Sequence, residues 1–216
     1  MMHRLRTTRA RAFTLVEALV VVGIIVLLVG ITVPAYKMIQ RESQNTGCLS
    51  NLRQNFSALQ SYQTANKGLL PMCDFLPVVT PDGTEGGLPN LLSKFMAVDS
   101  PTWLCPSDID TESLETGTSY TYFPGLIRFT PEIQFQVLQV LLAMPQDASP
   151  VQREQLRLQT ESKLVLALFE DDSKGLFPLL LDSADRHPGG TRVPRNGVYL
   201  DGSARAIKVE FDAEEP

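Results

Sequence analysis

The sequence has few of the features that metal-binding and nucleophilic enzyme motifs require. Its three cysteines, Cys48, Cys73 and Cys105, form no CxxC or CxH pair, so their spacing does not identify a metal site. No GxSxG turn, which would expose a serine nucleophile, occurs among the 216 residues. In an oxidising compartment, two of the three thiols would form a disulfide and leave one free. The sequence does not decide which two would pair.

Positive charge is scarce after the first twelve residues. Residues 1–12 contain four arginines and no acidic residue. Removing those four from the 19 basic residues of the chain leaves 15, against 24 acidic residues. Nucleic-acid binding is driven by neutralising phosphates, which this balance disfavours. We therefore expect no nucleic-acid partner.

The sequence does have one long apolar run. From Leu15 to Val33 only Glu17 is charged. As a helix, these residues would extend about 28 Å, close to the thickness of the hydrocarbon core of a bilayer. The run exceeds the roughly 7–15 apolar residues of a cleaved secretory signal, so we expect a retained transmembrane helix. The arginines before it predict a cytoplasmic N-terminus and an extracytoplasmic remainder.

Glu17 needs an explanation, because a charge in the apolar phase costs a few kcal/mol. One explanation is that the side chain lies near the interface and reaches water. The other is that it meets a positively charged partner when helices pack side by side.

The segment AFTLVE, residues 12–17, resembles the processing site of type IV prepilins and pseudopilins. In that family a prepilin peptidase removes a short basic leader, the new N-terminal Phe is N-methylated, and a Glu lies at the fifth mature position. The resemblance implies cleavage between Ala12 and Phe13, N-methylation of Phe13 and a helix kink at Pro34. It also implies that Glu17 neutralises the N-terminal amine of a neighbouring subunit. The family normally has Gly before the cut; Ala12 is small enough that we still expect processing.

Three further segments are similar to a branch of this family with a His…Asp-Gly signature near the C-terminus. They are NTGCLSNLRQ around Cys48, WLCPSD around Cys105, and HPGG…GVYLDGSARAI, which begins at His187. The gap from His187 to Asp201 is longer here than in that signature. Matching pieces nevertheless recur along most of the chain.

The resemblance and the residue pattern together predict an α+β, pilin-like fold. Leu49, Leu52, Phe56 and Leu59 form an apolar stripe at helical spacing, so we expect a long N-terminal helix whose second half packs on a small antiparallel sheet. The predicted parts are a cleaved leader (1–12), a transmembrane and assembly helix (13–34), its amphipathic continuation (35–68) and a globular head (69–216).

Within the head, residues 130–162 predict an inserted helical hairpin. Its second helix would open with a capping box at Ser149, and Ile133, Val137, Leu138 and Leu141 would pack against the head. Residues 163–211 would supply C-terminal strands. The run KLVLALFED (163–171) predicts a buried strand, and residues 197–211 predict a hairpin around Asp201-Gly202. The segment TSYTYFPG adds another strand, giving a sheet of three or four.

Acidic residues surround His187, but they lack the spacing of a dedicated calcium loop. We interpret His187 as a side chain that hydrogen-bonds a turn, and Asp201 as a turn residue. Trp103 is expected in the core. We therefore predict no catalytic residue, no metal and no cofactor. A calcium site, the alternative, would use Asp182, Asp185, His187 and Asp201.

Taken together, the sequence predicts a non-enzymatic, prepilin-like subunit held in the cytoplasmic membrane by one helix. Its partners would be prepilin peptidase and other pilin or pseudopilin subunits, in a type IV pilus or a type II secretion pseudopilus at the periplasm or cell surface. The alternative is a membrane-tethered extracytoplasmic module that binds calcium or a glycan and does not polymerise. An anchored hydrolase that uses His187 is the least favoured interpretation.

Overall fold

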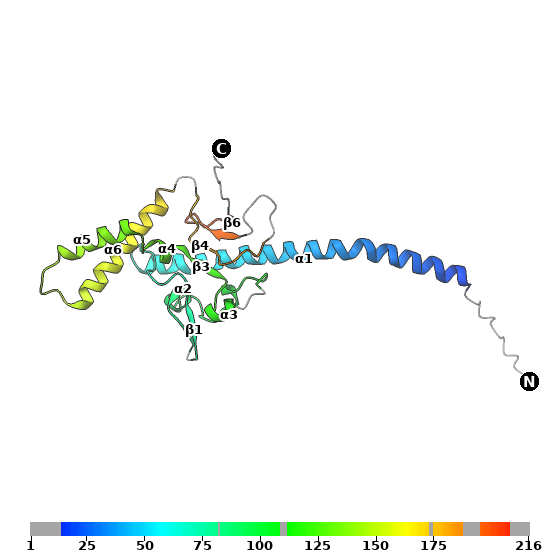
Figure 1. Ribbon diagram of the computed structural model, residues 1–216, viewed down its shortest axis with the longest axis horizontal. Coiled ribbons are helices and arrows are strands. Elements are labelled where there is room, and N and C mark those ends of the chain that lie inside the picture. The colour runs from blue at the N-terminus through cyan, green and yellow to red at the C-terminus, as the bar shows by residue number, and fades with distance from the viewer. Residues whose placement is uncertain (1–13, 82, 109–111, 173–174, 188–194, 208–216) are drawn as a thin grey trace, which may run out of the picture. The chain divides into compact units, whose positions relative to one another are not determined.

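The computed structural model of the chain describes residues 14–81, 83–108, 112–172, 175–187 and 195–207. It divides into two compact units, Met1–Glu42 and Ser43–Pro216. Helix α1 (Leu15–Ala65) is the longest element, with 51 residues (Figure 1). It is followed by a turn in which Gly68 has a φ of 79°.

In the first unit, the described residues form the N-terminal part of α1. Every side chain from Thr14 to Glu42 is exposed, including the whole apolar run. The run is long and apolar enough to cross a membrane, as the sequence predicts. Valine and isoleucine are common in it, yet helix is the state in which one apolar segment satisfies its own backbone groups without water. Pro34 lies inside α1.

The second unit contains the remaining elements. The helices are α2 (Gly87–Leu91), η1 (Pro101–Trp103), α3 (Glu112–Thr116), α4 (Phe123–Ile127), α5 (Pro131–Leu142) and α6 (Pro150–Glu170). The strands are β1 (Val78–Thr80), β2 (Gly83–Glu85), β3 (Tyr120–Tyr122), β4 (Leu180–Asp182), β5 (Asn196–Val198) and β6 (Ala204–Ala206).

Two antiparallel sheets occur in the described part of the second unit. A two-stranded ribbon pairs β1 with β2, and a four-stranded sheet has the order β3-β4-β5-β6. In the larger sheet Tyr120 lies opposite Asp182, and Asn196 lies opposite Ala206. A long N-terminal helix and a small antiparallel sheet give an α+β layout, as predicted.

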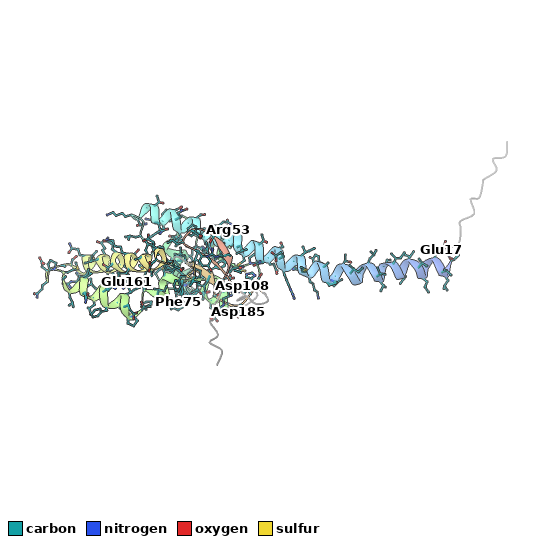
Figure 2. The ribbon with its side chains drawn as sticks, turned by 90° about the horizontal axis from the view of Figure 1, so that it is seen from above. Glu17, Arg53, Phe75, Asp108, Glu161 and Asp185 are labelled. Carbon is teal, nitrogen blue, oxygen red and sulfur yellow. The ribbon has the colours of Figure 1, made fainter. Side chains whose placement is uncertain are left out.

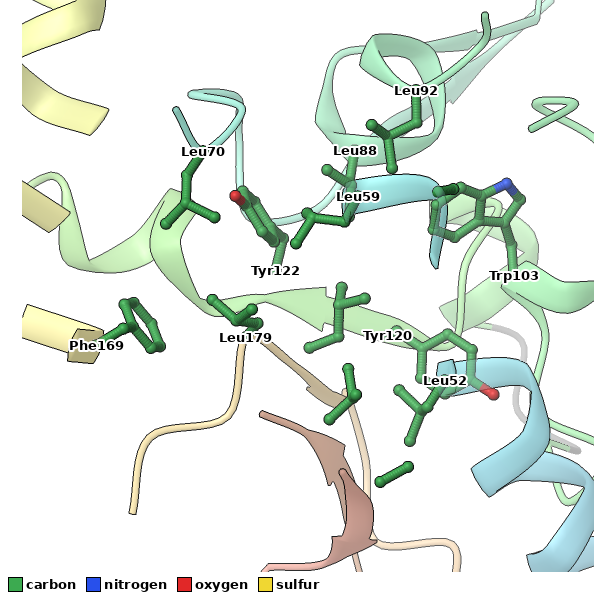
Figure 3. Packing of buried hydrophobic residues seen from close by; sticks show 14 of the residues in the cluster. Leu52, Leu59, Leu70, Leu88, Leu92, Trp103, Tyr120, Tyr122, Phe169 and Leu179 are labelled. Atoms are coloured by element: carbon green, nitrogen blue, oxygen red, sulfur yellow. The ribbon is translucent and has the colours of Figure 1, made fainter. Parts of the chain in front are cut away.

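The core of the second unit forms between α1 and the larger sheet. Leu52 and Leu59 of α1 are fully buried, and Leu49 and Phe56 are partly buried, so the predicted apolar stripe is confirmed. Figure 3 shows Leu52 and Leu59 near the tyrosines of β3. Trp103, predicted to be in the core, is 1% exposed, and its indole N–H donates to the Ala97 carbonyl at 3.1 Å.

Helices α5 and α6 form the predicted helical hairpin and lie side by side (Figure 1). The predicted capping box is present, since Ser149 Oγ accepts from the Gln152 N–H and Gln152 Oε1 accepts from the Ser149 N–H. Ile133 and Val137 are buried as expected. Leu138 is 52% exposed, so its predicted packing against the head is wrong.

The strand predicted for residues 163–171 is also wrong, because these residues continue α6 as far as Glu170. A short apolar run fits a buried strand and a buried helix equally well. Here the capped helix start at Ser149 lies upstream with no breaker in between, so the helix extends through the run. Val165 and Phe169, four residues apart, form its buried face.

The predicted C-terminal hairpin is present as β5 and β6. Its turn differs from the expected tight turn, in which both Asp201 and Gly202 would have a positive φ. The Gly202 N–H donates to the Tyr199 carbonyl at 2.9 Å, and the Tyr199 N–H donates to the Ser203 carbonyl at 3.0 Å. Gly202 has a φ of 79°, whereas Asp201 keeps a negative φ. Asp201 instead accepts the Ser203 N–H at 2.8 Å. Residues 208–211 lie outside the described residues.

Candidate functional site

Four buried side chains with metal-ligating atoms meet beside the sheet: Cys48, Cys105, Asp182 and His187. One ligand atom from each lies within 4.8 Å of those from the other three. Cys48 and Asp182 are fully buried, Cys105 is 3% exposed and His187 is 8% exposed. Thiols, carboxylates and imidazoles are seldom gathered in a core without a purpose, because an unpaired buried polar group is costly.

Cys48 and Asp182 face each other from α1 and β4. The Cys48 thiol donates to Asp182 Oδ1 at 3.2 Å. The other carboxylate oxygen of Asp182 accepts the Asn196 N–H at 2.6 Å, which ties it to β5. The α1 stripe turns Cys48 inward, and the strand alternation of β4 turns Asp182 inward.

Cys105 and His187 lie in the segments that follow η1 and β4. His187 Nε2 lies 3.4 Å from Cys105 Sγ and 3.4 Å from the Asp182 carboxylate. The imidazole nitrogen thus faces a thiol and a carboxylate, contacts that the sequence analysis did not predict for a turn-supporting histidine.

A buried ion pair holds these two segments together. Arg186 lies 3.1 Å from the Asp108 carboxylate, and their side chains are 2% and 4% exposed. Arg186 also donates to the Ser119 carbonyl at 3.2 Å. The Ser119 hydroxyl in turn accepts the Cys105 N–H at 2.9 Å and donates to Asp108. The backbone at Cys105 and His187 is therefore fixed from outside the cluster.

The pKa values of the two thiols are shifted in opposite directions. The interaction with Cys48, together with those of His187 and the Ser107 N–H, lowers the pKa of Cys105 to about 5, although burial opposes this shift. The same interaction, together with burial, raises the pKa of Cys48. Of the two thiols, Cys105 therefore loses its proton more readily.

The other two groups hold protons more tightly than usual. Burial raises the pKa of Asp182 to about 6, although the Asn196 N–H opposes this. Burial lowers the pKa of His187, but the hydrogen bond with Cys105 and the charge of Asp182 outweigh it and raise the pKa overall. Two thiols, a carboxylate and an imidazole whose ligand atoms lie this close together could hold a metal ion.

The structure brings together only some of the residues that the sequence analysis considered for a metal. Asp182 and His187 belong to the cluster. Asp185 is exposed and pairs with Arg195 at 2.5 Å, and Asp201 supports its own turn. The four predicted candidates therefore do not form one site.

The sequence analysis missed the two cysteines as partners of Asp182 and His187. They are far apart in the chain, and no local spacing links them. The available signal was that the three segments around Cys48, Cys105 and His187 had been grouped in the sequence analysis by their resemblance to one prepilin-like branch. All three cysteines are free thiols. Cys73 lies apart from the cluster, and burial raises the pKa of its thiol to about 12.

A second candidate site lies at the start of α1, where Figure 2 labels Glu17. Glu17 Oε2 accepts from the Thr14 N–H at 2.8 Å and from the Thr14 hydroxyl at 2.9 Å. The Thr14 hydroxyl oxygen accepts the Glu17 N–H at 3.2 Å. This reciprocal pair is a capping box that opens the helix. Ala12 and Phe13, the predicted processing residues, lie outside the described residues.

Comparison with protein-family models finds no matching family, and comparisons with curated proteins and with solved structures find no similar chain. Functional inference therefore depends on the residues themselves.

Proposed function

We propose that the chain is a non-enzymatic, prepilin-like subunit with a pilin-like fold, cleaved between Ala12 and Phe13 and N-methylated at Phe13. It is inserted in the cytoplasmic membrane by the apolar part of α1, with its N-terminus cytoplasmic and its head extracytoplasmic. Processed subunits assemble into a type IV pilus or a type II secretion pseudopilus through lateral packing of these helices.

The observation that supports the proposal is that the most apolar part of α1 is also fully exposed. The run Leu15–Val33 is apolar and exposed on every side, apart from one acidic side chain in its first turn. Such a surface needs lipid or other helices around it. A surrounding of identical helices supplies both cover for the apolar side chains and a charged partner for Glu17.

The capping box adds a competing role for Glu17 that has to be separated from assembly. In a single chain, the carboxylate is already satisfied by Thr14. Assembly through Glu17 requires that the carboxylate also attract the amine of a neighbouring chain. A neutral acceptor would serve the cap, but only a charge would serve the amine.

The chain itself shows which substitution separates the two roles. At Ser149 the same motif uses the neutral side chain of Gln152, whose oxygen accepts the Ser149 N–H at 2.9 Å. The corresponding distance from the Thr14 N–H to Glu17 is 2.8 Å. Glu17→Gln should therefore keep the helix cap and lose the negative charge. Thr14→Ala should weaken the cap and keep the charge.

The test expresses both variants in a host that has the assembly machinery. Glu17→Gln is expected to insert in the membrane at wild-type level and to be absent from sheared or cross-linked filaments. Thr14→Ala is expected to assemble. Assembly of Glu17→Gln at wild-type level would overturn the role of the charge. Loss of assembly in Thr14→Ala alone would assign Glu17 to capping.

Processing is tested independently by mass spectrometry of the mature N-terminus. Methylated Phe13 is the expected result. A protein that retains residues 1–12, in a host whose prepilin peptidase processes other substrates, would overturn the proposed cleavage. It would favour the membrane-tethered module that does not polymerise.

A further inference from the structure

We propose that Cys48, Cys105, Asp182 and His187 bind one Zn²⁺ ion in a closed, tetrahedral, structural site. The site lies entirely in the second unit and does not depend on the membrane segment or on filament assembly. It ties α1 and β4 to the segments that follow η1 and β4.

Two of the distances between the donor atoms match the edges of a zinc tetrahedron, and a third is slightly shorter. With Zn–S of about 2.3 Å and Zn–N or Zn–O of about 2.0–2.1 Å, neighbouring ligand atoms lie about 3.3–3.8 Å apart. Cys105 Sγ and His187 Nε2 are 3.4 Å apart, and His187 Nε2 and Asp182 Oδ2 are also 3.4 Å apart. Cys48 Sγ is 3.2 Å from Oδ1, the other oxygen of Asp182, and one ligand atom from each of the four residues lies within 4.8 Å of those from the other three.

His187 Nε2 has the position expected of a ligand. It lies equally far from a sulfur and a carboxylate oxygen, and one N–H cannot point well at both. A metal ion at the centre of the four groups would accept the nitrogen lone pair and remove that conflict.

Each of the three anionic ligands has a hydrogen-bond donor outside the cluster. The Tyr120 hydroxyl lies 3.3 Å from Cys48 Sγ, the Ser107 N–H donates to Cys105, and the Asn196 N–H donates to Asp182. Metal sites use such outer partners to orient ligands and to stabilise their charge.

The donor set selects the metal. Two sulfurs and an imidazole suit Zn²⁺, whereas Ca²⁺ takes six to eight oxygen ligands. The set therefore does not match the calcium site considered from the sequence. All four positions are filled by protein and the ligands are buried, which is the pattern of a structural zinc site, since a catalytic one keeps a position for water.

A disulfide between Cys48 and Cys105 is the competing use of the two thiols. It would leave the Asp182 carboxylate and His187 Nε2 as each other's partners in the core, 3.4 Å apart, with the hydroxyl of Tyr120 beside the Cys48 sulfur. A zinc ion engages all four groups at once. The two possibilities differ in mass and in thiol reactivity, so they are directly separable.

The first experiment uses the full chain, extracted from membranes in detergent. Thiols are alkylated at lysis, and the peptides are analysed by mass spectrometry. A second sample is reduced, stripped with a chelator and loaded with Zn²⁺. We expect one zinc per chain, with Cys48 and Cys105 protected from alkylation until the chelator is added. Co²⁺ in place of Zn²⁺ should give the visible absorption of a tetrahedral thiolate site.

Ligand variants should lose the metal. Cys48→Ser, Cys105→Ser and His187→Gln are expected to lower zinc affinity by more than the roughly 10- to 100-fold that removal of an outer partner costs. Cys73→Ser is the control, because Cys73 is a free thiol that is not in the cluster, and it should bind zinc like the wild type.

A matched pair on β3 keeps the test valid if a ligand variant fails to fold. Tyr120 and Tyr122 are both buried, but only the Tyr120 hydroxyl lies against Cys48. The Tyr122 hydroxyl has no hydrogen-bond partner among the described residues. Tyr120→Phe should weaken zinc binding about 10- to 100-fold with the fold intact. Tyr122→Phe should leave zinc binding unchanged.

Three results would overturn the site. One is a Cys48–Cys105 disulfide in protein alkylated at lysis. The second is zinc uptake that Cys48→Ser and Cys105→Ser leave unchanged. The third is a wild-type chain that shows no tetrahedral cobalt spectrum after reduction and loading.

Discussion

The two units of the chain differ in where their polar side chains find hydrogen-bond partners. In the first, polar side chains within the apolar run are few, and each is satisfied by its own helix: Glu17 bonds Thr14, and the Thr32 hydroxyl donates to the Leu28 carbonyl. In the second, several buried polar groups contact segments that are far away in the chain. Cys48 meets residues at positions 105, 120 and 182.

The difference shows which polar contacts stabilise the structure of each unit. A helix surrounded by lipid has to satisfy its hydrogen-bonding groups within the helix, because no water is available to them. A protein core can use long-range polar contacts, but a partner lost there leaves a buried group without a substitute. Substitutions at polar positions should therefore hardly affect the first unit's fold, whereas substitutions at buried polar positions with long-range partners should strongly destabilise the second.

The largest expected effect is at the ion pair of Arg186 and Asp108. Arg186→Met leaves the Asp108 charge in the core and should lower the free energy of unfolding by about 3–5 kcal/mol. Trp103 is the only tryptophan and is buried in the second unit, so its fluorescence during denaturant unfolding of the full chain in detergent reports this directly.

Two further variants turn this measurement into a comparison of the units. Glu17→Gln should leave the Trp103 transition unchanged, because Glu17 lies in the first unit. Adding Asp108→Asn to Arg186→Met removes the stranded charge and should recover part of the loss. A loss below about 1 kcal/mol in Arg186→Met, the range of exposed pairs, would contradict the buried pair.

A leucine pair on α1 tests the same contrast for apolar side chains. Leu59 is fully buried and Leu27 is 63% exposed. Leu59→Ala should lower the free energy of unfolding of the second unit by about 2–5 kcal/mol, because it leaves a cavity. Leu27→Ala should leave the Trp103 transition where it is in the wild type. Equal shifts for the two variants would contradict the different roles of the two parts of α1.

The contrast also explains what the sequence could predict. The apolar run of α1, the stripe at Leu52 and Leu59, the capping box at Ser149 and the hairpin at Gly202 are each encoded within a few neighbouring residues. Local patterns of this kind were sufficient to predict the long helix, the helical hairpin and strands β3, β5 and β6 of the antiparallel sheet, but not β4 (Leu180–Asp182). They did not separate strand from helix at Val165, since an apolar run without alternation fits both.

The cluster at Cys48 could not be predicted in the same way. Its members come from three distant parts of the chain, at Cys48, at Cys105 and at Asp182 with His187. Their convergence depends on the sheet register that places Asp182 opposite Tyr120. No spacing rule links a cysteine on a helix to a histidine well over a hundred residues later. Even Asp182 and His187, both considered as metal candidates, were grouped with Asp185 and Asp201 because those residues are closest in sequence.

The smallest expected effect is at the turn between β5 and β6. The exposed Asp201 carboxylate there is hydrogen-bonded by a residue close in sequence, as polar side chains are in the first unit. The hydroxyl and the backbone N–H of Ser203 lower the pKa of Asp201 below its ordinary value of 3.8. A carboxyl whose pKa is lower in the folded chain stabilises the fold above pH 3.8, and this contribution disappears as the pH falls through the folded pKa.

Asp201→Ala should therefore cost at most about 1 kcal/mol at pH 7. Asp201→Asn, which keeps an acceptor for the Ser203 N–H, should cost less. Both differences from the wild type should shrink as unfolding is measured at pH values below 3.8. A difference for Asp201→Asn that stays constant over this range would mean that the Asp201 charge contributes nothing to the turn.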